Sequence, residues 1–210
     1  MDPHLSGARS CQNAVRYSVS PAQFVLASRS SRRADLLRSV GFEFLIEPAD
    51  IDESVMPRED PRDYVRRMAL SKAKHVRSDL PVLGADTIVH VDGDILGKPI
   101  DRGQAISFLD TLSGRQHEVM TAVALSLHNR IECTVVVTKV HFRSLKQYEA
   151  SRYWDTGEPV DKAGGYALQG VGAVFVDKVI GSYSAVIGLP MAETERLLSS
   201  FGVDTWQNRI

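Results

Sequence analysis

Apolar residues along this chain follow two patterns, short continuous runs and longer stripes that repeat every three or four residues. Residues 24–27 (FVLA) form a run short enough for one buried strand. After it, Ala34, Leu37 and Val40 repeat at helical spacing, and Gly41 stands where a helix C-cap glycine is expected. The pattern therefore predicts a strand that passes through a serine- and arginine-rich turn into a helix.

A second helix is predicted after Asp60-Pro61, an acidic N-cap followed by proline at the first helical position. Its apolar stripe comprises Tyr64, Val65, Met68, Ala69, Ala73 and Val76. Lys72 lies four residues from both Met68 and Val76, so its stem borders this stripe. Two interpretations follow: a lysine whose stem covers apolar surface while its ammonium stays in water, or an ammonium directed into a cleft beside the stripe.

Residues 81–91 form an apolar run that ends at the turn Asp92-Gly93, which predicts a central strand covered on both faces. Asp86 interrupts this run. A carboxylate there needs a cation, a metal ion or hydrogen-bond donors, because an unpaired buried charge is very costly. It is either a structural aspartate or a catalytic or metal-binding one. Gly84, which lets another backbone or a ligand approach closely, favours the second interpretation.

The rest of the chain intermixes strands and helices. The predicted elements are a short strand at 42–48, a helix capped by Asp101 and stopped at Ser113-Gly114, a β-hairpin with strands 118–127 and 131–142, a helix from a capping box at 144–147 to Gly157, a strand at 173–180 and a last helix from Pro190 to Gly202. This order predicts an α/β (mixed α+β) fold around a mixed sheet.

The composition narrows the function classes. The chain has 210 residues, 43% apolar and 24% charged, enough for one domain or for two lobes that share a core. Its net charge of −1 and few aromatic residues count against a nucleic-acid-binding domain but allow a small anionic ligand held by a local cluster. Cys11 and Cys133 are far apart, which argues against a disulfide framework and favours a reducing cytoplasm.

No stretch of the sequence has the length of a membrane span, since the strongest apolar stretches, near 134–140 and 172–176, are only as long as a strand. Residues 1–23 lack a continuous apolar segment, so no secretory signal is expected. Arg9, Arg16 and a single acid, Asp2, give them a weak transit-peptide composition. We favour a disordered N-terminal extension or an upstream start codon over a transit peptide.

The turn after the first strand has two interpretations. Free backbone N–H groups at the start of a helix attract anions, and Arg29, Arg32 and Arg33 add fork-shaped donors that suit phosphate oxygens. The other interpretation is an ordinary helix capped by Ser30 or Ser31, with solvated arginines.

Other motifs carry less information. Gly97-Lys98-Pro99 is not a P-loop, because the glycine spacing is wrong and proline replaces the metal-binding Ser/Thr. The glycine-rich segment 158–170 is typical of a ligand loop and equally of a surface connection. The histidines show no metal-ligand spacing, and His90 and His117 are expected to be solvated or at strand edges.

Six segments, taken together and in order, closely resemble the Maf family of septum-formation-inhibitor-like nucleoside triphosphate pyrophosphatases. They are residues 27–37 (ASRSSRRADLL), 84–87 (GADT), 96–99 (LGKP), 113–117 (SGRQH), 161–170 (DKAGGYALQG) and 188–190 (GLP). The resemblance covers residues 24 to about 202. It implies a Maf/ITPase-like fold with an elongated mixed sheet, flanking helices and a cleft between two lobes, with residues 24–205 as a single catalytic domain and a homodimer as the common assembly.

The resemblance also implies an activity and its residues. The expected reaction is hydrolysis of a nucleoside triphosphate to the monophosphate and pyrophosphate with Mg²⁺ or Mn²⁺. The proton acceptor of the family falls on Asp86, and the specificity positions on Arg32, Thr87 and Gln169. Further catalytic residues are Glu53, Lys72 and Lys98, phosphate-binding residues are Ser28, Ser30, Arg32 and Arg33, and the metal ligands are Asp86 and Glu53.

The sequence departs from the family pattern at two positions. Ser31 replaces the usual proline, and Arg29 stands where many relatives carry a small residue, which would crowd or strengthen the phosphate turn. The loop at 161–170 resembles the subgroup that acts on dTTP and UTP, and we expect a house-cleaning role that extends to modified pyrimidine nucleotides. The alternative is a non-enzymatic nucleotide-binding regulator of cell division or septum formation.

These residue types suit the expected chemistry. Asp86 and Glu53 offer the oxygen ligands that hard cations prefer, and Asp86 would accept the proton of the attacking water. Lys72, Lys98 and Arg32 would neutralise charge that develops on the phosphates. Thr87 and Gln169 can both donate and accept hydrogen bonds, which suits the edge of a pyrimidine.

Overall fold

The computed structural model describes residues 22–206. The predicted N-terminal extension, residues 1–23, lies outside this range except for Ala22 and Gln23. Within the described residues seven strands form one sheet in the order β2-β1-β3-β5-β6-β7, with β4 paired to β3. The strands are β1 (Phe24–Leu26), β2 (Phe44–Ile46), β3 (Val82–Val91), β4 (Asp94–Leu96), β5 (Gln116–Leu127), β6 (Arg130–Phe142) and β7 (Val176–Ile180).

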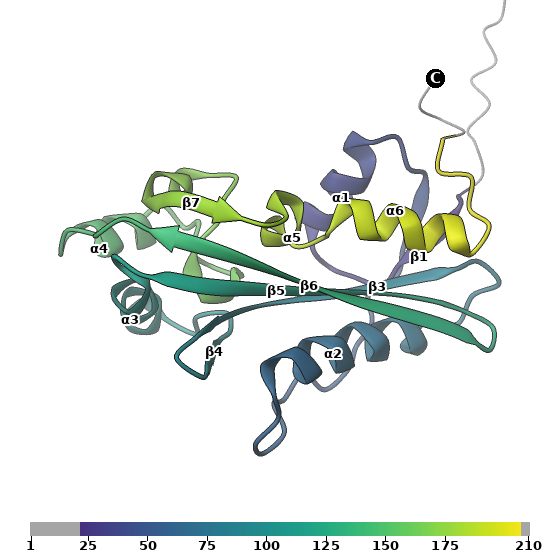
Figure 1. Cartoon of the computed structure of the whole chain (residues 1–210), viewed down its shortest axis with the longest axis horizontal. Coiled ribbons are helices and arrows are strands. Elements are labelled where there is room, and N and C mark those ends of the chain that lie inside the picture. Colours follow the sequence, from purple (N-terminus) through teal and green to yellow (C-terminus); the bar gives the residue numbers. More distant parts are fainter. Residues whose placement is uncertain (1–21, 207–210) are drawn as a thin grey trace, which may run out of the picture.

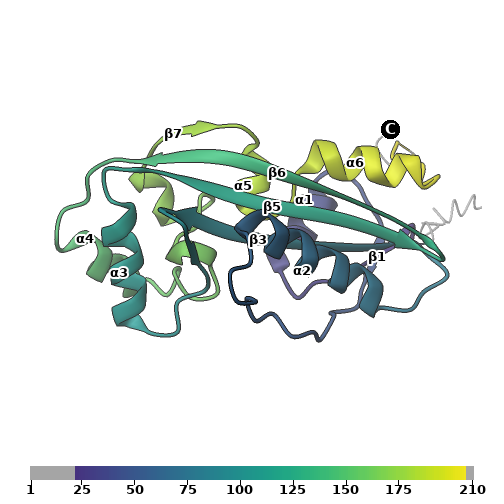
Figure 2. The ribbon, with the colours of Figure 1, turned by 60° about the horizontal axis from the view of Figure 1, so that its bottom comes forward.

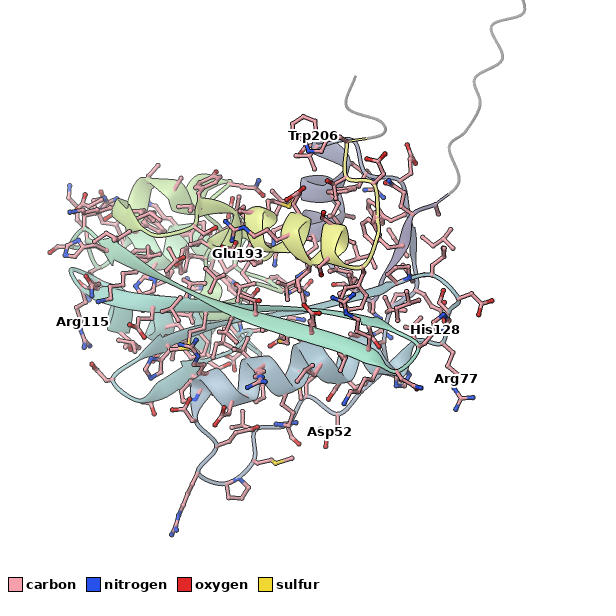
Figure 3. The ribbon with its side chains drawn as sticks, turned by 45° about the vertical axis from the view of Figure 1, so that its right-hand side comes forward. Asp52, Arg77, Arg115, His128, Glu193 and Trp206 are labelled. Carbon is pink, nitrogen blue, oxygen red and sulfur yellow. The ribbon has the colours of Figure 1, made fainter. Side chains whose placement is uncertain are left out.

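The sheet is mixed, as the sequence predicts. β1 is parallel to both β2 and β3, whereas the other pairs are antiparallel. β5 and β6 form the predicted hairpin, and together with β3 they run along the long axis of the molecule (Figures 1 and 2). In Figure 3, Arg115 and His128 mark the two ends of β5.

Six helices flank this sheet within residues 22–206. They are α1 (Ser31–Ser39), α2 (Pro61–His75), α3 (Arg102–Leu112), α4 (Glu149–Trp154), α5 (Tyr183–Ile187) and α6 (Met191–Ser200), with 3₁₀ turns at Ala163–Gly165 and Val171–Phe175. None of the helices in this range has the length and apolar character needed to cross a membrane.

Local sequence signals account for several helix ends. The side chain of Asp60 accepts a hydrogen bond from the Arg62 amide at 2.8 Å, and that of Asp101 accepts one from the Gln104 amide at 2.8 Å. Both aspartates therefore cap their helices as predicted. Gly41 has a φ of 84°, a left-handed conformation that glycine adopts at little cost after the end of α1.

The two faces of the sheet are covered differently. Side chains alternate between faces along a strand, so Gly84 and Ile88 face α2 while Leu83, Ala85, Val89 and Val91 face the other side. Figure 1 shows α2 on one side of the sheet and α1, α5 and α6 on the opposite side. The stripe predicted for α2 is buried against the sheet.

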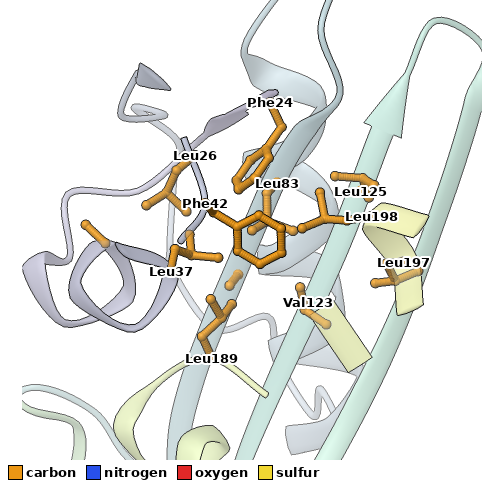
Figure 4. Packing of buried hydrophobic residues seen from close by; sticks show 12 residues of the cluster. Phe24, Leu26, Leu37, Phe42, Leu83, Val123, Leu125, Leu189, Leu197 and Leu198 are labelled. Atoms are coloured by element: carbon orange, nitrogen blue, oxygen red, sulfur yellow. The ribbon is translucent and has the colours of Figure 1, made fainter. Parts of the chain in front are cut away.

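The face opposite α2 carries two separate apolar clusters. The first includes Leu83 and Ala85 and packs on α1 and α6 (Figure 4). The second includes Val89 and Val91 and packs on α3 and α4, which lie together at one end of the sheet. β3 therefore contributes to both clusters, and Asp86 and Thr87 lie on it between the residues of the first cluster and those of the second.

Two predicted elements differ from the structure. The prediction that a capping box at 144–147 starts a helix is wrong, because α4 begins at Glu149. The side chain of Glu149, which is paired with Arg143, accepts the Lys146 amide at 2.7 Å. Ser113 accepts the Leu145 amide at 2.8 Å. Glu149 therefore takes the Lys146 amide, which a Ser144 cap would bind. The strand predicted from residue 173 begins at Val176, because Val171–Phe175 form a 3₁₀ turn.

The expectation that His117 is solvated or at a strand edge is also wrong. His117 is only 2% exposed, its Nε2 lies 2.8 Å from the Tyr166 hydroxyl, and its ring packs edge-on against Phe142. It occupies the face of β5 that the second cluster covers, a register that the sequence does not reveal. Burial lowers its pKa to about 4, and the charge of His141 acts in the same direction.

The burial of His117 predicts a pH-dependent stability. Because its pKa falls from about 6.5 to about 4 on folding, only the unfolded chain takes up the proton between these values, so stability is lost as the pH falls. From pH 7 to pH 5 the advantage of the wild type over His117→Gln should shrink by about 2 kcal/mol in urea unfolding. The exposed His75→Gln should show no such change, and equal pH slopes for all three proteins would contradict this.

Gly84 predicts a second effect on stability. A Cβ at this position would overlap the carbonyl oxygen of Ala69 and the amide nitrogen of Ala73, so the close approach foreseen for Gly84 is that of the α2 backbone. Gly84→Ala should therefore lower the free energy of unfolding by about 2 kcal/mol or more, because neither backbone can move without strain. Gly97→Ala, where a Cβ meets no atom within 4 Å, should change it by no more than about 0.5 kcal/mol.

Candidate active site

A buried ion pair joins α2 to the central strand. Lys72 Nζ lies 2.7 Å from Asp86 Oδ1 and 2.8 Å from Glu53 Oε1. Lys72 and Asp86 are each only 8% exposed, whereas the Glu53 side chain is about half exposed. The ammonium of Lys72 is thus buried, which excludes the solvated lysine of the first interpretation, and one cation is shared by two carboxylates that are 33 residues apart in the chain.

The loop that carries Glu53 is fastened to α2. The Tyr64 hydroxyl donates to the Glu53 carbonyl oxygen at 2.8 Å, and Arg67 donates to the Ser54 carbonyl oxygen at 2.9 Å. Arg67 is itself held by Glu59. Figure 3 shows Asp52, the neighbour of Glu53, on the α2 side of the sheet. Residues of α2 therefore set the position of Glu53 through its main chain.

Several cations act on the Glu53 carboxylate. Desolvation alone would raise its pKa, but the hydrogen bond from Lys72 and the charges of Lys72, Lys98 and Arg33 outweigh it, so the pKa lies below its usual value. Lys98 comes from the turn after β4 and Arg33 from α1. Cationic residues from three separate segments thus surround the Glu53–Asp86 pair.

Arg33 links α1 to β3 and to the end of α5. Its Nη1 donates to Ser28 Oγ at 3.1 Å, its Nη2 to Thr87 Oγ1 at 3.2 Å and its Nε to the Gly188 carbonyl oxygen at 2.8 Å. The side chain is buried, and burial lowers its pKa, against the opposing charges of Asp86 and Glu53. All three nitrogens of the guanidinium therefore have partners within the protein.

The contact with Thr87 continues into β5. The hydroxyl oxygens of Thr87 and Thr121 lie 3.1 Å apart, and Thr121 donates to the Ala185 carbonyl oxygen at 2.7 Å. A hydroxyl has one hydrogen, and a carbonyl can only accept. The consistent order is that Arg33 donates to Thr87, Thr87 to Thr121 and Thr121 to Ala185. This polar seam crosses the sheet between the two apolar clusters.

A second group of cations lies around the turn of Lys98. The Gly164 amide donates to the Gly97 carbonyl oxygen at 3.0 Å, which brings the glycine-rich loop beside that turn. Burial lowers the pKa of Lys162, and the charges of Arg32 and Lys98 lower it further. Burial also lowers the pKa of Arg32, and the charge of Asp161 opposes this shift. Arg32 and Lys98 therefore both repel Lys162, an arrangement that an anionic ligand would relieve.

The phosphate-turn residues divide into two sets. Ser28 is buried, and its Oγ accepts the Ser30 amide at 3.2 Å as well as Arg33. Ser30 stands at the N-cap of α1 without a side-chain cap bond. Arg29 is exposed, 4.0 Å from Asp50. The side chain of Arg33 thus holds the turn together, whereas the side chains of Ser30 and Arg32 have no hydrogen-bond partner among residues 22–206.

The glycine-rich loop holds its residues Gln169 and Lys162 in different surroundings. Gln169 is exposed, and among the described residues its side chain has no hydrogen-bond or ion-pair partner that would connect it to Asp86. Lys162, in contrast, lies close enough to Arg32 and Lys98 for their charges to act on it. The sequence assigns it no role beyond its place in the glycine-rich segment. Its place in that segment, between Asp161 and four nearby glycines, was the available signal.

Asp86 and Glu53 fit a divalent cation. The position of Lys72 Nζ, bonded to one oxygen of each, shows that the two carboxylates can share a positive charge. Within residues 22–206 no group of three or more His, Cys, Asp or Glu side chains gathers to hold a metal ion. Mg²⁺ commonly uses one or two carboxylates and completes its shell with water and substrate phosphates, so two are sufficient.

The chain is similar to several known proteins. Residues 23–201 match the family of Maf-like proteins. The chain is 48% identical to a protein of Hahella chejuensis named dTTP/UTP pyrophosphatase, over 89% of this chain and 96% of that protein. It is 46% identical to a protein of the same name from Colwellia psychrerythraea, over 90% and 94% of the two chains. The solved structure of the Staphylococcus aureus Ham1 protein aligns with a TM-score of 0.41 at 11% identity, covering 67% of this chain and 80% of that one.

The buried ion pair predicts a large effect of removing its cation. Lys72→Met leaves the carboxylate of Asp86 without its partner, so the free energy of unfolding should fall by about 3 kcal/mol. Lys74→Met is the matched control, because Lys74 lies on the exposed side of the same helix and should cost at most about 0.5 kcal/mol. Denaturant titration of both variants would contradict the prediction if the two losses were equal.

Proposed function

Because the chain belongs to the Maf-like protein family, we propose that it hydrolyses dTTP and UTP to the monophosphate and pyrophosphate. It is a nucleoside triphosphate pyrophosphatase that cleaves the bond between the α and β phosphates. The observation that carries the substrate is the pair of relatives named dTTP/UTP pyrophosphatase, 46–48% identical to this chain over about nine-tenths of its length. The cluster of two carboxylates and several cations independently supports hydrolysis of a phosphoanhydride bond.

In the proposed reaction water attacks the α-phosphorus, the bond to the bridging oxygen breaks, and pyrophosphate leaves. Asp86 accepts the proton of the attacking water. Lys72 lies between Asp86 and Glu53. It keeps the carboxylate of Asp86 in place and adds positive charge beside the reacting phosphate. Glu53 contributes the second oxygen ligand. A bound Mg²⁺ or Mn²⁺, held by Asp86 and Glu53, would neutralise charge on the phosphate oxygens.

The remaining cations are proposed to bind the triphosphate. Arg32, Lys98 and Lys162 face the same region from three segments, and the repulsion of Lys162 by the other two falls when a polyanion enters. The Ser30 hydroxyl and the backbone amides at the start of α1 add neutral donors. Arg33, whose guanidinium is already bonded, is proposed to hold Ser28 and Thr87 in position for the phosphate turn.

Specificity is proposed to depend on Arg32, Thr87 and Gln169. Thr87 lies on β3 directly after Asp86, with its hydroxyl oriented by Arg33 and Thr121. Gln169 projects from the glycine-rich loop and can both donate to and accept from the edge of a pyrimidine. Modified pyrimidine nucleotides would be recognised by the same groups, which suits a house-cleaning role. We further propose that residues 24–205 form one catalytic domain, that the assembly is a homodimer and that the protein works in the cytoplasm.

The proposed function is tested by a panel of nucleoside triphosphates with Mg²⁺ or Mn²⁺, assayed for pyrophosphate. Asp86→Asn keeps the size of the side chain but removes the proton acceptor, so the turnover rate of dTTP and UTP should fall by about a thousandfold. Chelation of the metal should have a comparable effect.

Asp92→Asn is the control for this substitution. Asp92 directly follows the last residue of β3 in an exposed turn, and asparagine tolerates its φ of 54°. It should retain wild-type activity. Release of pyrophosphate by Asp86→Asn at the wild-type rate, or no release by the wild type from any nucleotide, would refute the proposal.

A further inference from the structure

Glu158 opens the glycine-rich loop, and both of its carboxylate oxygens accept hydrogen bonds. Its Oε1 accepts the Tyr153 hydroxyl at 2.6 Å and the Gly172 amide at 2.9 Å, and its Oε2 accepts the Val171 amide at 2.8 Å. The Tyr153 hydroxyl in turn accepts the Ala167 amide at 3.1 Å. One carboxylate and one phenol therefore fasten both ends of the span from Ala167 to Gly172.

The glycines of this span leave room for these contacts. A Cβ at Gly170 would overlap the Glu158 carboxylate, and one at Gly172 would lie 2.6 Å from the Tyr153 hydroxyl and 2.8 Å from the Ala167 carbonyl oxygen. Only glycine permits the main chain to come so close. The start of the loop is fixed as well, because Gly164 packs on Val89 and donates to Gly97.

Two polar side chains lie near these fixed points, Lys162 before Gly164 and Gln169 inside the span from Ala167 to Gly172. Lys162 is half-buried, and its ammonium is attracted by Asp161 and Glu158 while Arg32 and Lys98 repel it. Gln169 stands inside the fastened span and has no side-chain partner among the described residues. The main chain alone therefore decides where the amide of Gln169 is presented.

We propose that Glu158 and Tyr153 are positioning residues for base recognition. They touch no substrate, and they act by holding the span from Ala167 to Gly172 so that Gln169 meets the nucleobase in one orientation. The inference rests on the proposed function and extends it, because it assigns substrate preference to a carboxylate–phenol pair behind the specificity loop. A carboxylate that merely stabilised the fold would affect all nucleotides equally.

Tyr153→Phe is the sharpest test, since it removes one oxygen and keeps the ring that packs perpendicular to Phe175 at 5.0 Å. The ratio of kcat/KM for dTTP to that for dCTP should fall about tenfold, mainly through the KM for dTTP. The amides of Ala167, Val171 and Gly172 should exchange hydrogen faster. Glu158→Gln should act in the same direction, because its NH₂ group cannot accept from the amides.

Glu149→Gln is the matched control. Glu149 belongs to α4 and is also held by hydrogen bonds, from Arg143 at 2.7 and 2.9 Å and from the Lys146 amide, and none of these bonds involves a residue from 158 to 172. It should lose stability without a change in the dTTP-to-dCTP ratio.

Calorimetric binding of both nucleotides separates the two proposals. Binding by a wild type that does not hydrolyse them would refute the pyrophosphatase function, and the ratio of the two Kd values would then test positioning. An unchanged ratio in Tyr153→Phe, or unchanged amide exchange, would overturn the role of Glu158 and Tyr153. A wild type that binds neither nucleotide would overturn both proposals.

Discussion

A carboxylate in the middle of a covered strand needs a cation, a metal ion or hydrogen-bond donors, and the structure meets this need with Lys72. The ion pair between Lys72 and Asp86 joins α2 to β3 and draws Glu53 toward the same point. An unpaired charge at Asp86 would be very costly, so folding itself requires that these groups meet. The requirement for neutralisation thus assembles the group of side chains to which the proposed chemistry is assigned.

Arg33 has the corresponding role on the other face of the sheet. Through its three nitrogens it joins Ser28, Thr87 and Gly188, which belong to three of the segments that carry the family resemblance. Other such segments also meet in pairs: Gly97 accepts from Gly164, and His117 contacts Tyr166. Segments that are far apart in sequence are therefore partners in space, which explains why they are informative only as a set.

The sequence was sufficient wherever a local rule decided the outcome. The caps at Asp60 and Asp101, the apolar stripe of α2 and the hairpin of β5 and β6 follow from spacing and residue type. The charge of Asp86 inside an apolar run also predicted that a partner is needed, but the sequence did not show that Lys72 is this partner.

The remaining features depend on long-range contacts. The burial of His117 follows from the register of β5 against the second apolar cluster, and the internal bonds of Arg33 depend on the packing of α1 beside β3 and α5. The false capping box failed because Glu149 and Ser113 bind the local amides. α5 has five residues, too few to display a helical repeat. In the site, the place of Lys162 depends on the hydrogen bond from Gly164 to Gly97, which brings the glycine-rich loop beside Lys98 and which the sequence does not reveal.

The absence of a side chain at Gly84 has a consequence for how the site tolerates change. The backbones of α2 and β3 touch directly there, with no intervening layer of methyl groups. The height of the helix above the strand is consequently set by peptide atoms, which do not vary with amino-acid type. Lys72 directly precedes Ala73 and Asp86 lies two residues after Gly84, so this contact between main chains limits how far the two charged side chains can move apart.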